Sequence, residues 1–389
     1  MVAIFLLLAA LRELTVPAAD GLPLHVVVVP ATGDKTLPPV YWLDGGPGID
    51  ATASAGFWQT DGAIHLRHRD LVLIDQRGTG KSAPLACPEV RIGDPFVDTL
   101  DLAAVVRCRE GLQRDLSRFS TAQAVADIDS VRAALGHERI DLAGLSYGTR
   151  VAQEYLRAHA DRVRAAALLG SLPPEVKLPL PFAKTAWATL TRLVPAPEIA
   201  AADAAVPAAQ RGRFWEWVRG GMAIAPFQRE LRGLLRKVAQ GHAAEVIQSR
   251  KPVGFDGLLL SVSCPEDTLH IAPEEIASAA GGVFGTYRVA QQVAACKAWG
   301  VPPRDVPRDF VKAPTPVLLM AGEMDSITPP EWSDAIAARM PHARVVRIAG
   351  LGHFPDGLSH MECYDQIIAA FFEAGSADRL DLRCLSLMH

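Results

Sequence analysis

The sequence predicts an α/β fold, with a mostly parallel sheet, helices on both faces and an inserted helical cap. Two observations favour this class. Short apolar runs alternate with helical patterns in residues 19–170 and again in residues 309–389, which is typical of parallel sheets covered by crossover helices. Residues 171–308 instead read as mostly helical, with Pro- and Gly-rich breaks. We therefore expect a core in two parts, with the cap inserted between them.

Each element of the core follows from a local pattern. Short apolar runs bounded by Gly, Pro or Asp predict buried strands. Ser120 as N-cap and Gly136 behind the last turn predict a helix. The expected strands cover residues 26–29, 40–43, 71–74, 140–143, 163–169, 317–320 and 345–348. The expected core helices cover residues 120–135, 149–158, 331–339 and 361–372.

The N-terminus carries an apolar run of signal-peptide length. Residues 1–11 are all apolar, too few to span a bilayer, which takes about 20 residues. We expect residues 1–18 to be a signal-peptide remnant with a cleavage site after Ala18. A buried first element, or a start further upstream, is the alternative. No later stretch reads as a membrane span, so stable membrane insertion is not expected.

Composition and charge narrow the class of protein further. The chain has 389 residues, of which 49% are hydrophobic and 21% charged, with a formal net charge of −4. These values exclude intrinsic disorder, and without a basic block a nucleic-acid partner is not expected. Arg greatly outnumbers Lys and Asn is absent, a bias that favours a GC-rich bacterial gene.

The strongest chemical signal is the segment Gly144-Leu145-Ser146-Tyr147-Gly148. It follows an expected strand and opens an expected helix, the setting of a nucleophile elbow. Flanking glycines leave room beside a strained serine, so we expect Ser146 to be a nucleophile above the sheet. The amide of Tyr147, at the helix N-terminus, is expected to bind an oxyanion.

A nucleophilic serine needs a base and an orienting carboxylate. Asp325 and His353 follow the serine in chain order, each just after an expected strand, where open α/β sheets place their sites. The order Ser, Asp, His is that of α/β-hydrolases. We expect Asp325 to be the acid and His353 the base, with Glu323 and His360 as rival candidates.

An early strand–loop junction is expected to supply the second oxyanion donor. The segment Asp44-Gly45-Gly46-Pro47-Gly48 follows one of the expected strands. Its glycines allow close approach of the backbone to a substrate. We expect the amide of Gly45 to be the donor, with Gly46 as the rival.

Residues 75–82 superficially resemble a phosphate loop. Asp75 stands where the first glycine of that motif belongs, so we reject a nucleotide site. We expect Asp75 and Arg77 instead to brace the loop around Gly45 through charge-assisted hydrogen bonds.

Residues 44–48, 75–82 and 144–149 together carry a family resemblance. They are similar to the proline iminopeptidase and tripeptidyl aminopeptidase family of α/β-hydrolases, and the likeness covers most of the chain. The resemblance implies an α/β-hydrolase fold, a triad that maps onto Ser146, Asp325 and His353, and removal of residues from a free peptide N-terminus. Asp44 is a departure, because the family usually has histidine at this position.

The cap is expected to read the α-ammonium group of the substrate. A carboxylate in a partly desolvated pocket suits that role, and Glu266 and Asp267 are the candidates for substrate binding. Solvated surface acids are the alternative reading of both. Trp215, Trp217 and Trp299 are expected to pack in the cap core rather than line the site.

The six cysteines form three sequence-local pairs without zinc-site spacing. They resemble those of the secreted, tripeptidyl-type branch of the family. Disulfides persist only in oxidising compartments, so we expect a secreted or periplasmic protein. Six reduced, buried cysteines in a cytoplasmic enzyme are the alternative. The expected bridges are Cys87–Cys108, Cys264–Cys296 and Cys363–Cys384.

Together these expectations describe a serine aminopeptidase that acts through an acyl-enzyme, without metal or cofactor, on a peptide or small-molecule substrate. An esterase or amidase for small non-peptide substrates shares the fold and the triad, and is the first alternative. A non-catalytic secreted binding protein is the second. The oligomeric state is not predicted.

Overall fold

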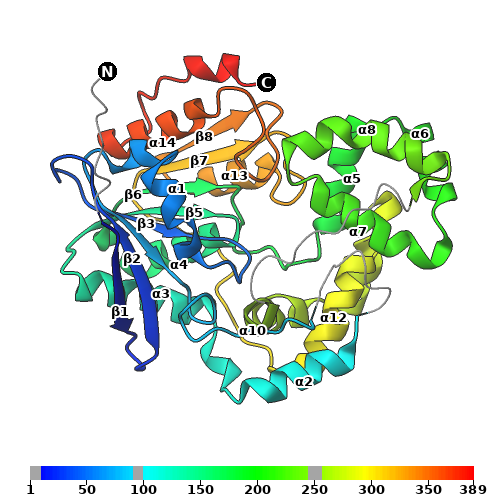
Figure 1. The fold of residues 1–389 in the computed structure, drawn as a ribbon, viewed down its shortest axis with the longest axis horizontal. Coiled ribbons are helices and arrows are strands. Elements are labelled where there is room, and N and C mark those ends of the chain that lie inside the picture. The colour runs from blue at the N-terminus through cyan, green and yellow to red at the C-terminus, as the bar shows by residue number, and fades with distance from the viewer. Residues whose placement is uncertain (1–9, 91–99, 244–255) are drawn as a thin grey trace, which may run out of the picture.

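The computed structural model describes residues 10–90, 100–243 and 256–389. Within these ranges eight strands form one sheet in the order β1-β2-β4-β3-β5-β6-β7-β8 (Figure 1). β2 pairs antiparallel with β1 and β4, and the remaining neighbours are parallel. The mostly parallel α/β class is therefore confirmed. The strands are β1 (Arg12–Pro17), β2 (Pro23–Val29), β3 (Val40–Leu43), β4 (Leu71–Ile74), β5 (Ile140–Leu145), β6 (Val163–Leu169), β7 (Val317–Gly322) and β8 (Ala343–Ile348).

Helices cover both faces of the sheet, which explains why its central strands are apolar throughout. All residues of β5 and β7 are buried. One core contains the side chains between the sheet and the helices α3 (Thr121–Ala134), α4 (Tyr147–His159) and α13 (Pro330–Ala337). The other lies between the sheet and the helices α1 (Ala55–Gln59) and α14 (Glu362–Ala374).

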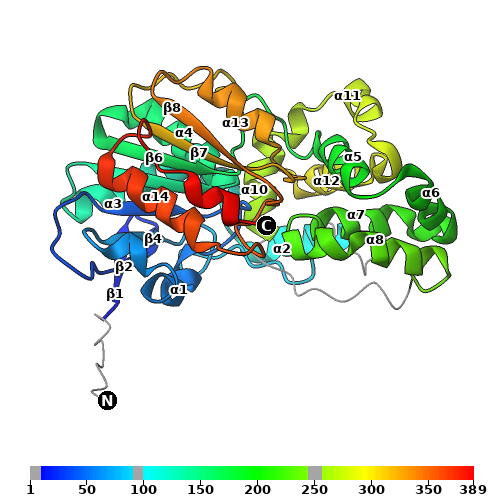
Figure 2. The ribbon, with the colours of Figure 1, turned by 90° about the horizontal axis from the view of Figure 1, so that it is seen from above.

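The described residues between β6 and β7 form helices and lie to one side of the sheet (Figures 1 and 2). We call this part of the chain the cap. A separate core of buried residues, including Phe214, Trp215 and Trp217, holds α5 to α8 together. The cap helices are α5 (Phe182–Leu193), α6 (Ala196–Ala205), α7 (Arg211–Gly221), α8 (Ala225–Ala239), α10 (Asp256–Glu266), α11 (Pro273–Ser278) and α12 (Tyr287–Trp299).

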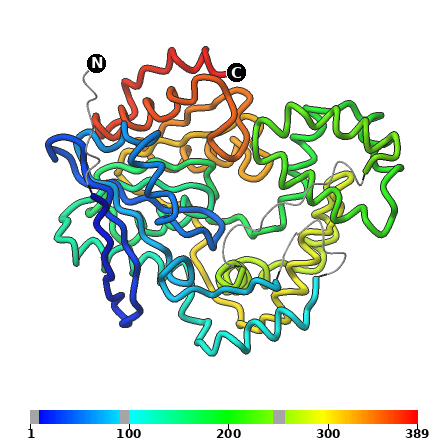
Figure 3. The backbone as a smooth tube through the Cα atoms, in the orientation of Figure 1, coloured from blue at the N-terminus to red at the C-terminus, as the bar shows by residue number. Residues whose placement is uncertain are grey.

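One helix from the first half of the chain packs against the cap. Helix α2 (Leu102–Leu112) lies beside α12, as the tube in Figure 3 shows. Arg109 on α2 donates from Nη1 to the carbonyl oxygen of Ala298 at 3.3 Å. Helix α2 was not predicted from the sequence. Its contact with α12 joins the first part of the core to the cap.

The expected signal-peptide remnant, residues 1–18, stays a prediction. Residues 1–9 lie outside the described residues. Residues 12–17, however, form β1 and pair with β2 along their whole length. Cleavage after Ala18 would therefore remove a strand from the sheet. The described part of the chain contains no helix that is long and apolar enough to span a membrane.

All six cysteines are paired, and the three predicted pairings are confirmed. The Cα–Cα distance of Cys264 and Cys296 is 5.2 Å, and it is 5.7 Å in the other two pairs. Cys264 and Cys296 join α10 to α12 inside the cap, and both are fully buried. This bridge therefore ties two helices that packing alone would otherwise hold together.

Candidate active site

Ser146 lies in the tight turn between β5 and α4. Its backbone has φ 55° and ψ −120°, a region that residues with a side chain rarely adopt and that is typical of strained functional sites. The neighbouring glycines are required by space: a Cβ on Gly144 would lie 2.6 Å from the carbonyl oxygen of Gly148. A Cβ on Gly148 would lie 2.1 Å from the carbonyl oxygen of Leu43. The elbow geometry expected for this motif is present.

Asp325 and His353 are hydrogen-bonded to each other. His353 donates from Nδ1 to Asp325 Oδ2 at 2.8 Å, an arrangement that leaves Nε2 as the imidazole nitrogen able to accept a proton. Both side chains are buried, with 3% and 1% of their area exposed. The backbone amides of Ile327 and Thr328 donate to the other oxygen of Asp325, at 2.8 and 2.9 Å. These bonds fix the carboxylate in a turn after β7.

Thr328 completes this arrangement and was not predicted. Its Oγ1 donates to Asp325 Oδ2 at 2.7 Å and lies 3.0 Å from His353 Nδ1. Asp and Thr side chains often form hydrogen bonds within a few residues of each other in turns. The spacing of Asp325 and Thr328 was therefore a weak signal for this contact in the sequence.

The rival acid and base are placed elsewhere. His360 is exposed and lies 3.0 Å from Glu362. Glu323 is partly exposed, and its backbone oxygen accepts from Arg192 at 2.6 Å. The structure therefore favours Asp325 and His353 over both rivals.

The end of β6 connects the serine turn to the imidazole. The amide of Ser146 donates to the carbonyl oxygen of Leu169 at 2.9 Å. Gly170 follows, with φ +59°, and a Cβ there would lie 3.2 Å from the His353 ring. The described residues contain no hydrogen bond between Ser146 and His353, and such bonds are often loose before a substrate binds.

The cap holds the loops that carry the acid and the base. The amide of His353 donates to the carbonyl oxygen of Ala223, between α7 and α8, at 2.8 Å. Gln228 on α8 is buried, and its Nε2 donates to the carbonyl oxygens of Met222 at 2.5 Å and Met324 at 2.9 Å. One short segment of the cap therefore touches both loops.

The Gly45 loop lies against the serine turn. A Cβ on Gly45 would lie 3.0 Å from Ser146 Cβ and 3.6 Å from its Oγ, so only a glycine lets the backbone come this close. The adjacent Asp44 is half-buried, and its Oδ2 accepts from Trp42 Nε1 at 3.0 Å. Burial raises the pKa of Asp44. This geometry is consistent with the amide of Gly45 as an oxyanion donor beside that of Tyr147.

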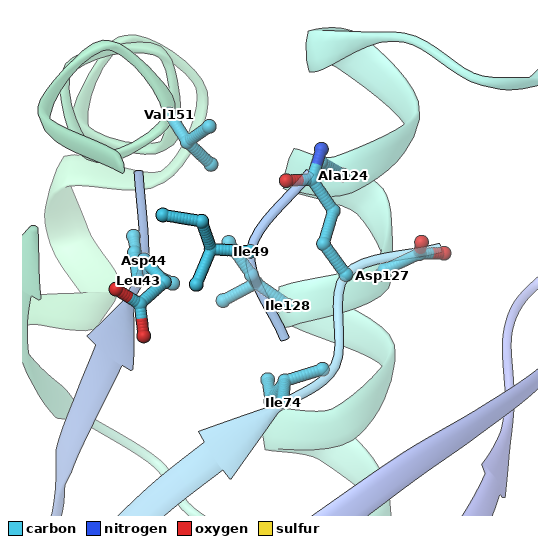
Figure 4. A pocket seen from close by; sticks show the side chains of 9 residues that line it. Leu43, Asp44, Ile49, Ile74, Ala124, Asp127, Ile128 and Val151 are labelled. Atoms are coloured by element: carbon cyan, nitrogen blue, oxygen red, sulfur yellow. The ribbon is translucent and has the colours of Figure 1, made fainter. Parts of the chain in front are cut away.

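A small cavity of about 30 Å³ lies behind this loop. In Figure 4 the side chains of Ile49, Ile74, Ile128 and Val151 surround it, with the carboxylate of Asp44 to one side. It has room for little more than a water molecule. We therefore interpret it as a small packing gap behind the loop and not as a substrate pocket.

Asp75 and Arg77 have different partners. Asp75 is fully buried and accepts from the amides of Thr52, at 3.0 Å, and Lys81, at 2.9 Å. Thr52 lies just after the Gly45 loop, so Asp75 supports that loop as expected. The expectation for Arg77 was wrong: its guanidinium binds Asp127 on α3 and Asp20, because β4 directs it toward the α3 face.

Glu266 is bonded to the start of α3. Its Oε1 accepts from the amide of Thr121 at 2.8 Å, and its Oε2 from Thr121 Oγ1 at 2.5 Å. Because Thr121 Oγ1 gives its proton to Glu266, it accepts from Tyr147 Oη, 2.8 Å away. Burial raises the pKa values of both Glu266 and Tyr147. Glu266 is thus linked, through Thr121 Oγ1, to the side chain of Tyr147, the residue after Ser146, and not to the backbone amide of Tyr147.

Asp267 is held by two arginines. Arg150 and Arg308 donate to its two oxygens at 2.7 and 2.8 Å. A cavity of about 360 Å³ borders Glu266, and Arg150 and Arg308 also line it. The lining of this cavity contains both carboxylates and guanidinium groups, so its charge does not single out an ammonium group. These contacts favour structural roles for Glu266 and Asp267, and their binding of a substrate amine stays a prediction.

The tryptophans of the cap pack as expected. Trp215 and Trp299 are fully buried, and their Nε1 atoms donate to Asp203 at 2.8 Å and to Ser261 at 3.2 Å. Trp217 is 6% exposed and packs against Phe227. In the described ranges no group of three or more His, Cys, Asp or Glu side chains is placed to hold a metal ion.

Comparison with known proteins places the chain in a family. The family described as alpha/beta hydrolase fold matches residues 38–355. The chain belongs to the α/β hydrolase family. A solved structure of proline iminopeptidase from Mycobacterium smegmatis has a TM-score of 0.47 at 18% identity, covering 94% of this chain and 98% of that one.

Curated relatives of this α/β hydrolase carry peptidase names. The serine protease Hip1 of Mycobacterium tuberculosis is 33% identical over 177 residues, 41% of this chain and 34% of that protein. Proline iminopeptidase of Neisseria meningitidis is 30% identical, covering 38% and 37%. Tripeptidyl aminopeptidase of Streptomyces coelicolor is 29% identical, covering 31% and 26%. The predicted family resemblance is confirmed, but these matches cover 31% to 41% of this chain rather than most of it. The chain spans about a third of the length of these relatives.

Proposed function

We propose that this α/β hydrolase is a serine peptidase that releases residues from the free N-terminus of peptides. The observation that carries the proposal is the hydrogen bond of 2.8 Å between Asp325 and His353, next to a serine in a strained elbow turn. The peptidase names of the relatives favour peptides as substrates. Their aminopeptidase names favour a free N-terminus.

We propose one role for each residue of the site. Ser146 attacks the scissile carbonyl carbon, and His353 takes the serine proton and passes it to the leaving amine. Asp325 orients the imidazole and stabilises its protonated form. The amides of Gly45 and Tyr147 donate to the oxyanion of the tetrahedral intermediate. Water then hydrolyses the acyl-enzyme by the same route.

The cysteines support a proposal for the compartment of the protein. Three bridges are typical of proteins in an oxidising compartment, where disulfides form and persist. We therefore place the protein outside the cytoplasm, as secreted or periplasmic.

A panel of chromogenic substrates tests the function. It compares free and N-acetylated aminoacyl and tripeptidyl amides with short acyl esters. We expect turnover of free-amine peptides, little turnover of N-acetylated ones, and labelling by a fluorophosphonate probe that Ser146→Ala abolishes. Ser146→Ala should lower kcat by several powers of ten. Equal turnover of free and acetylated peptides would exclude an aminopeptidase. Preference for esters would favour an esterase or amidase. No labelling by the probe would favour a binding protein.

A further inference from the structure

A cavity of about 190 Å³ lies between the sheet and the helices α1 and α14. Val40, Trp42 and Asp44 line it, because alternate residues of the extended β3 segment point to the same face of the sheet. Side chains from both helices complete the wall. The cavity therefore follows β3 from the first residue of the strand to the residue that directly precedes Gly45.

One end of this cavity borders the loops of the active site. Asp44 is bonded to Gly45, where a Cβ would lie 3.0 Å from Ser146 Cβ. Leu169 accepts the hydrogen bond from the amide of Ser146 at 2.9 Å, and Pro355 follows the imidazole base by two positions. Asp44, Leu169 and Pro355 all line the cavity. It is thus placed to receive a group that is attached to the substrate close to the scissile bond.

Aromatic rings form much of the wall of the cavity. The ring centres of Trp42 and Trp58 lie 4.8 Å apart, and those of Phe57 and Trp58 lie 5.2 Å apart, both pairs edge to face. Tyr364 and Phe372 add two further rings. Phe57 is 46% exposed, whereas Trp58 is buried, so the aromatic wall reaches from the surface into the interior. The faces of such rings attract organic cations.

The charged side chains of the cavity are acidic. Asp44 and Asp365 line it, and none of its described lining residues is Lys or Arg. Asp365 is bonded to His65, at 3.1 Å, whereas Asp44 accepts from the neutral Nε1 of Trp42 at 3.0 Å. Burial raises the pKa of Asp44, and the negative charge of Asp50 acts in the same direction. A cation bound beside Asp44 would offset this cost of burying its carboxylate.

We propose that this cavity binds a basic side chain of the substrate, a Lys or Arg in the residue that supplies the scissile carbonyl. Such a side chain has an apolar stem for the aromatic wall and a cationic head for the carboxylate of Asp44. The proposal rests on the peptidase function and adds a substrate class to it.

The size of the cavity agrees with this occupant. An apolar cavity of about 150 Å³ holds a benzene ring, and pockets for whole ligands measure about 300–1,000 Å³. The 190 Å³ found here therefore suit one long side chain. An α-ammonium group is the other source of an organic cation in a peptide. Because the cavity extends along the whole of β3, a head on a long stem fills it better than an amine beside the reacting carbonyl.

Matched substrates test the proposal and separate the two sources. They are aminoacyl and tripeptidyl chromogenic amides with Lys or norleucine attached to the chromophore, each with a free and with an acetylated N-terminus. Norleucine has a similar apolar stem without the ammonium group. We expect Lys to be preferred by about 10- to 150-fold in kcat/KM, the factor of a charge-assisted hydrogen bond. Equal rates on Lys and norleucine, or a preference for norleucine, would overturn the proposal.

Variants connect the preference to the cavity. Asp44→Asn should bring the ratio of kcat/KM for Lys and norleucine close to one, and general damage to the oxyanion loop cancels in this ratio. Phe57→Leu should lower the ratio by about 2- to 5-fold, the factor of an exposed cation–π contact. Asp50→Asn is the matched control, because Asp50 is a half-buried acid of the same loop that does not line the cavity. It should keep most of the preference.

Two results with these variants would contradict the proposal. One is a preference for Lys that survives Asp44→Asn. The other is an Asp44→Asn variant that loses only its preference for free over acetylated N-termini, which would assign the cavity to the α-ammonium group.

Binding gives a readout that is independent of turnover. In Ser146→Ala, calorimetry with the Lys and norleucine peptides should show tighter binding of the Lys peptide, and adding Asp44→Asn should remove the difference. Tighter binding of Lys by a protein without peptidase activity would refute the proposed function and keep the basic-side-chain site. An active peptidase that binds and cleaves both peptides equally would refute this site alone.

Discussion

The amide of His353 donates to the carbonyl oxygen of Ala223 at 2.8 Å, across the boundary between the sheet domain and the cap. Gln228, one turn into the following helix, donates to the carbonyl oxygen of Met324, next to Asp325, at 2.9 Å. The cap segment around these residues therefore fixes both loops of the Asp–His pair. A movement of this segment would displace the base, so we expect the geometry of the active site to depend on the closed position of the cap.

Gln228→Met should weaken this link while keeping the volume of the side chain. The carbonyl oxygens of Met222 and Met324 would lose a buried donor, which costs about 1–3 kcal/mol of unfolding free energy. Small shifts of the base are costly for the rate, so kcat should fall about 10- to 100-fold. Kinetics and denaturant unfolding measure both effects. Gln240→Met, at the exposed end of α8, is the control, and an unchanged kcat in Gln228→Met would refute the positioning role.

Gly170→Ala tests the close packing between the end of β6 and the imidazole. A Cβ at this position would lie 3.0 Å from Thr328 Oγ1 and 3.2 Å from His353 Nδ1, with a backbone φ of +59°. We expect a loss of about 1–2 kcal/mol in stability from the left-handed backbone and, in addition, a lower kcat. Gly136→Ala has a similar φ of +70° but no neighbour within 4 Å. It should lose stability without losing activity, and equal kcat losses in both would contradict the packing argument.

Glu266→Gln tests whether Glu266 is structural. Burial raises the pKa of this carboxyl above its ordinary value of 4.5, so the folded protein holds the proton at pH values where the unfolded chain has released it. Its contribution to stability is therefore full below pH 4.5 and is lost as the pH rises through the folded pKa. Gln imitates the protonated form, and the variant should gain stability over the wild type as the pH increases.

Unfolding in denaturant at a series of pH values from 4 to 7, roughly the range above the ordinary carboxyl pKa, measures this difference. Glu275→Gln is the control of opposite sign, because the side chain of Lys177 lowers the pKa of Glu275. A selective loss of activity on free-amine peptides in Glu266→Gln, relative to a small acyl ester, would instead restore the amine-binding role of Glu266.

The double variant Cys264→Ala, Cys296→Ala tests the bridge within the cap. The two cysteines are 32 positions apart, and closing a loop of that length stabilises by about 3–4 kcal/mol in the chain-entropy model. The free energy of unfolding of the cap should fall by about that amount, measured in denaturant. A reductant can open all three bridges, so it is not a matched control. Unchanged stability of the double variant would show that packing of α10 and α12 suffices.

The core elements were predictable because they depend on local patterns. β3, β4 and β6 have the bounds that the apolar runs predicted, and Ser146 could be recognised from five consecutive residues. β1 was missed because it is short and mostly exposed, so its sequence has no apolar run of its own. The apolar run that precedes it is the more conspicuous feature of the N-terminus. Helix α2 was missed because its packing partner, α12, lies almost 200 positions later in the chain.

By itself, the sequence determined the α/β class and the serine elbow, since each is carried by neighbouring residues or by punctuated apolar runs. It gave the order of the acid and base and the cysteine pairing only as expectations. Only the tertiary structure decided what surrounds them. In the folded chain, Gln228 and Gly170 lie against the loops of the acid and the base. Glu266 accepts a hydrogen bond from Thr121 and does not face open solvent. These outcomes depend on which hydrogen-bonding groups meet after folding, across separations that no local pattern records.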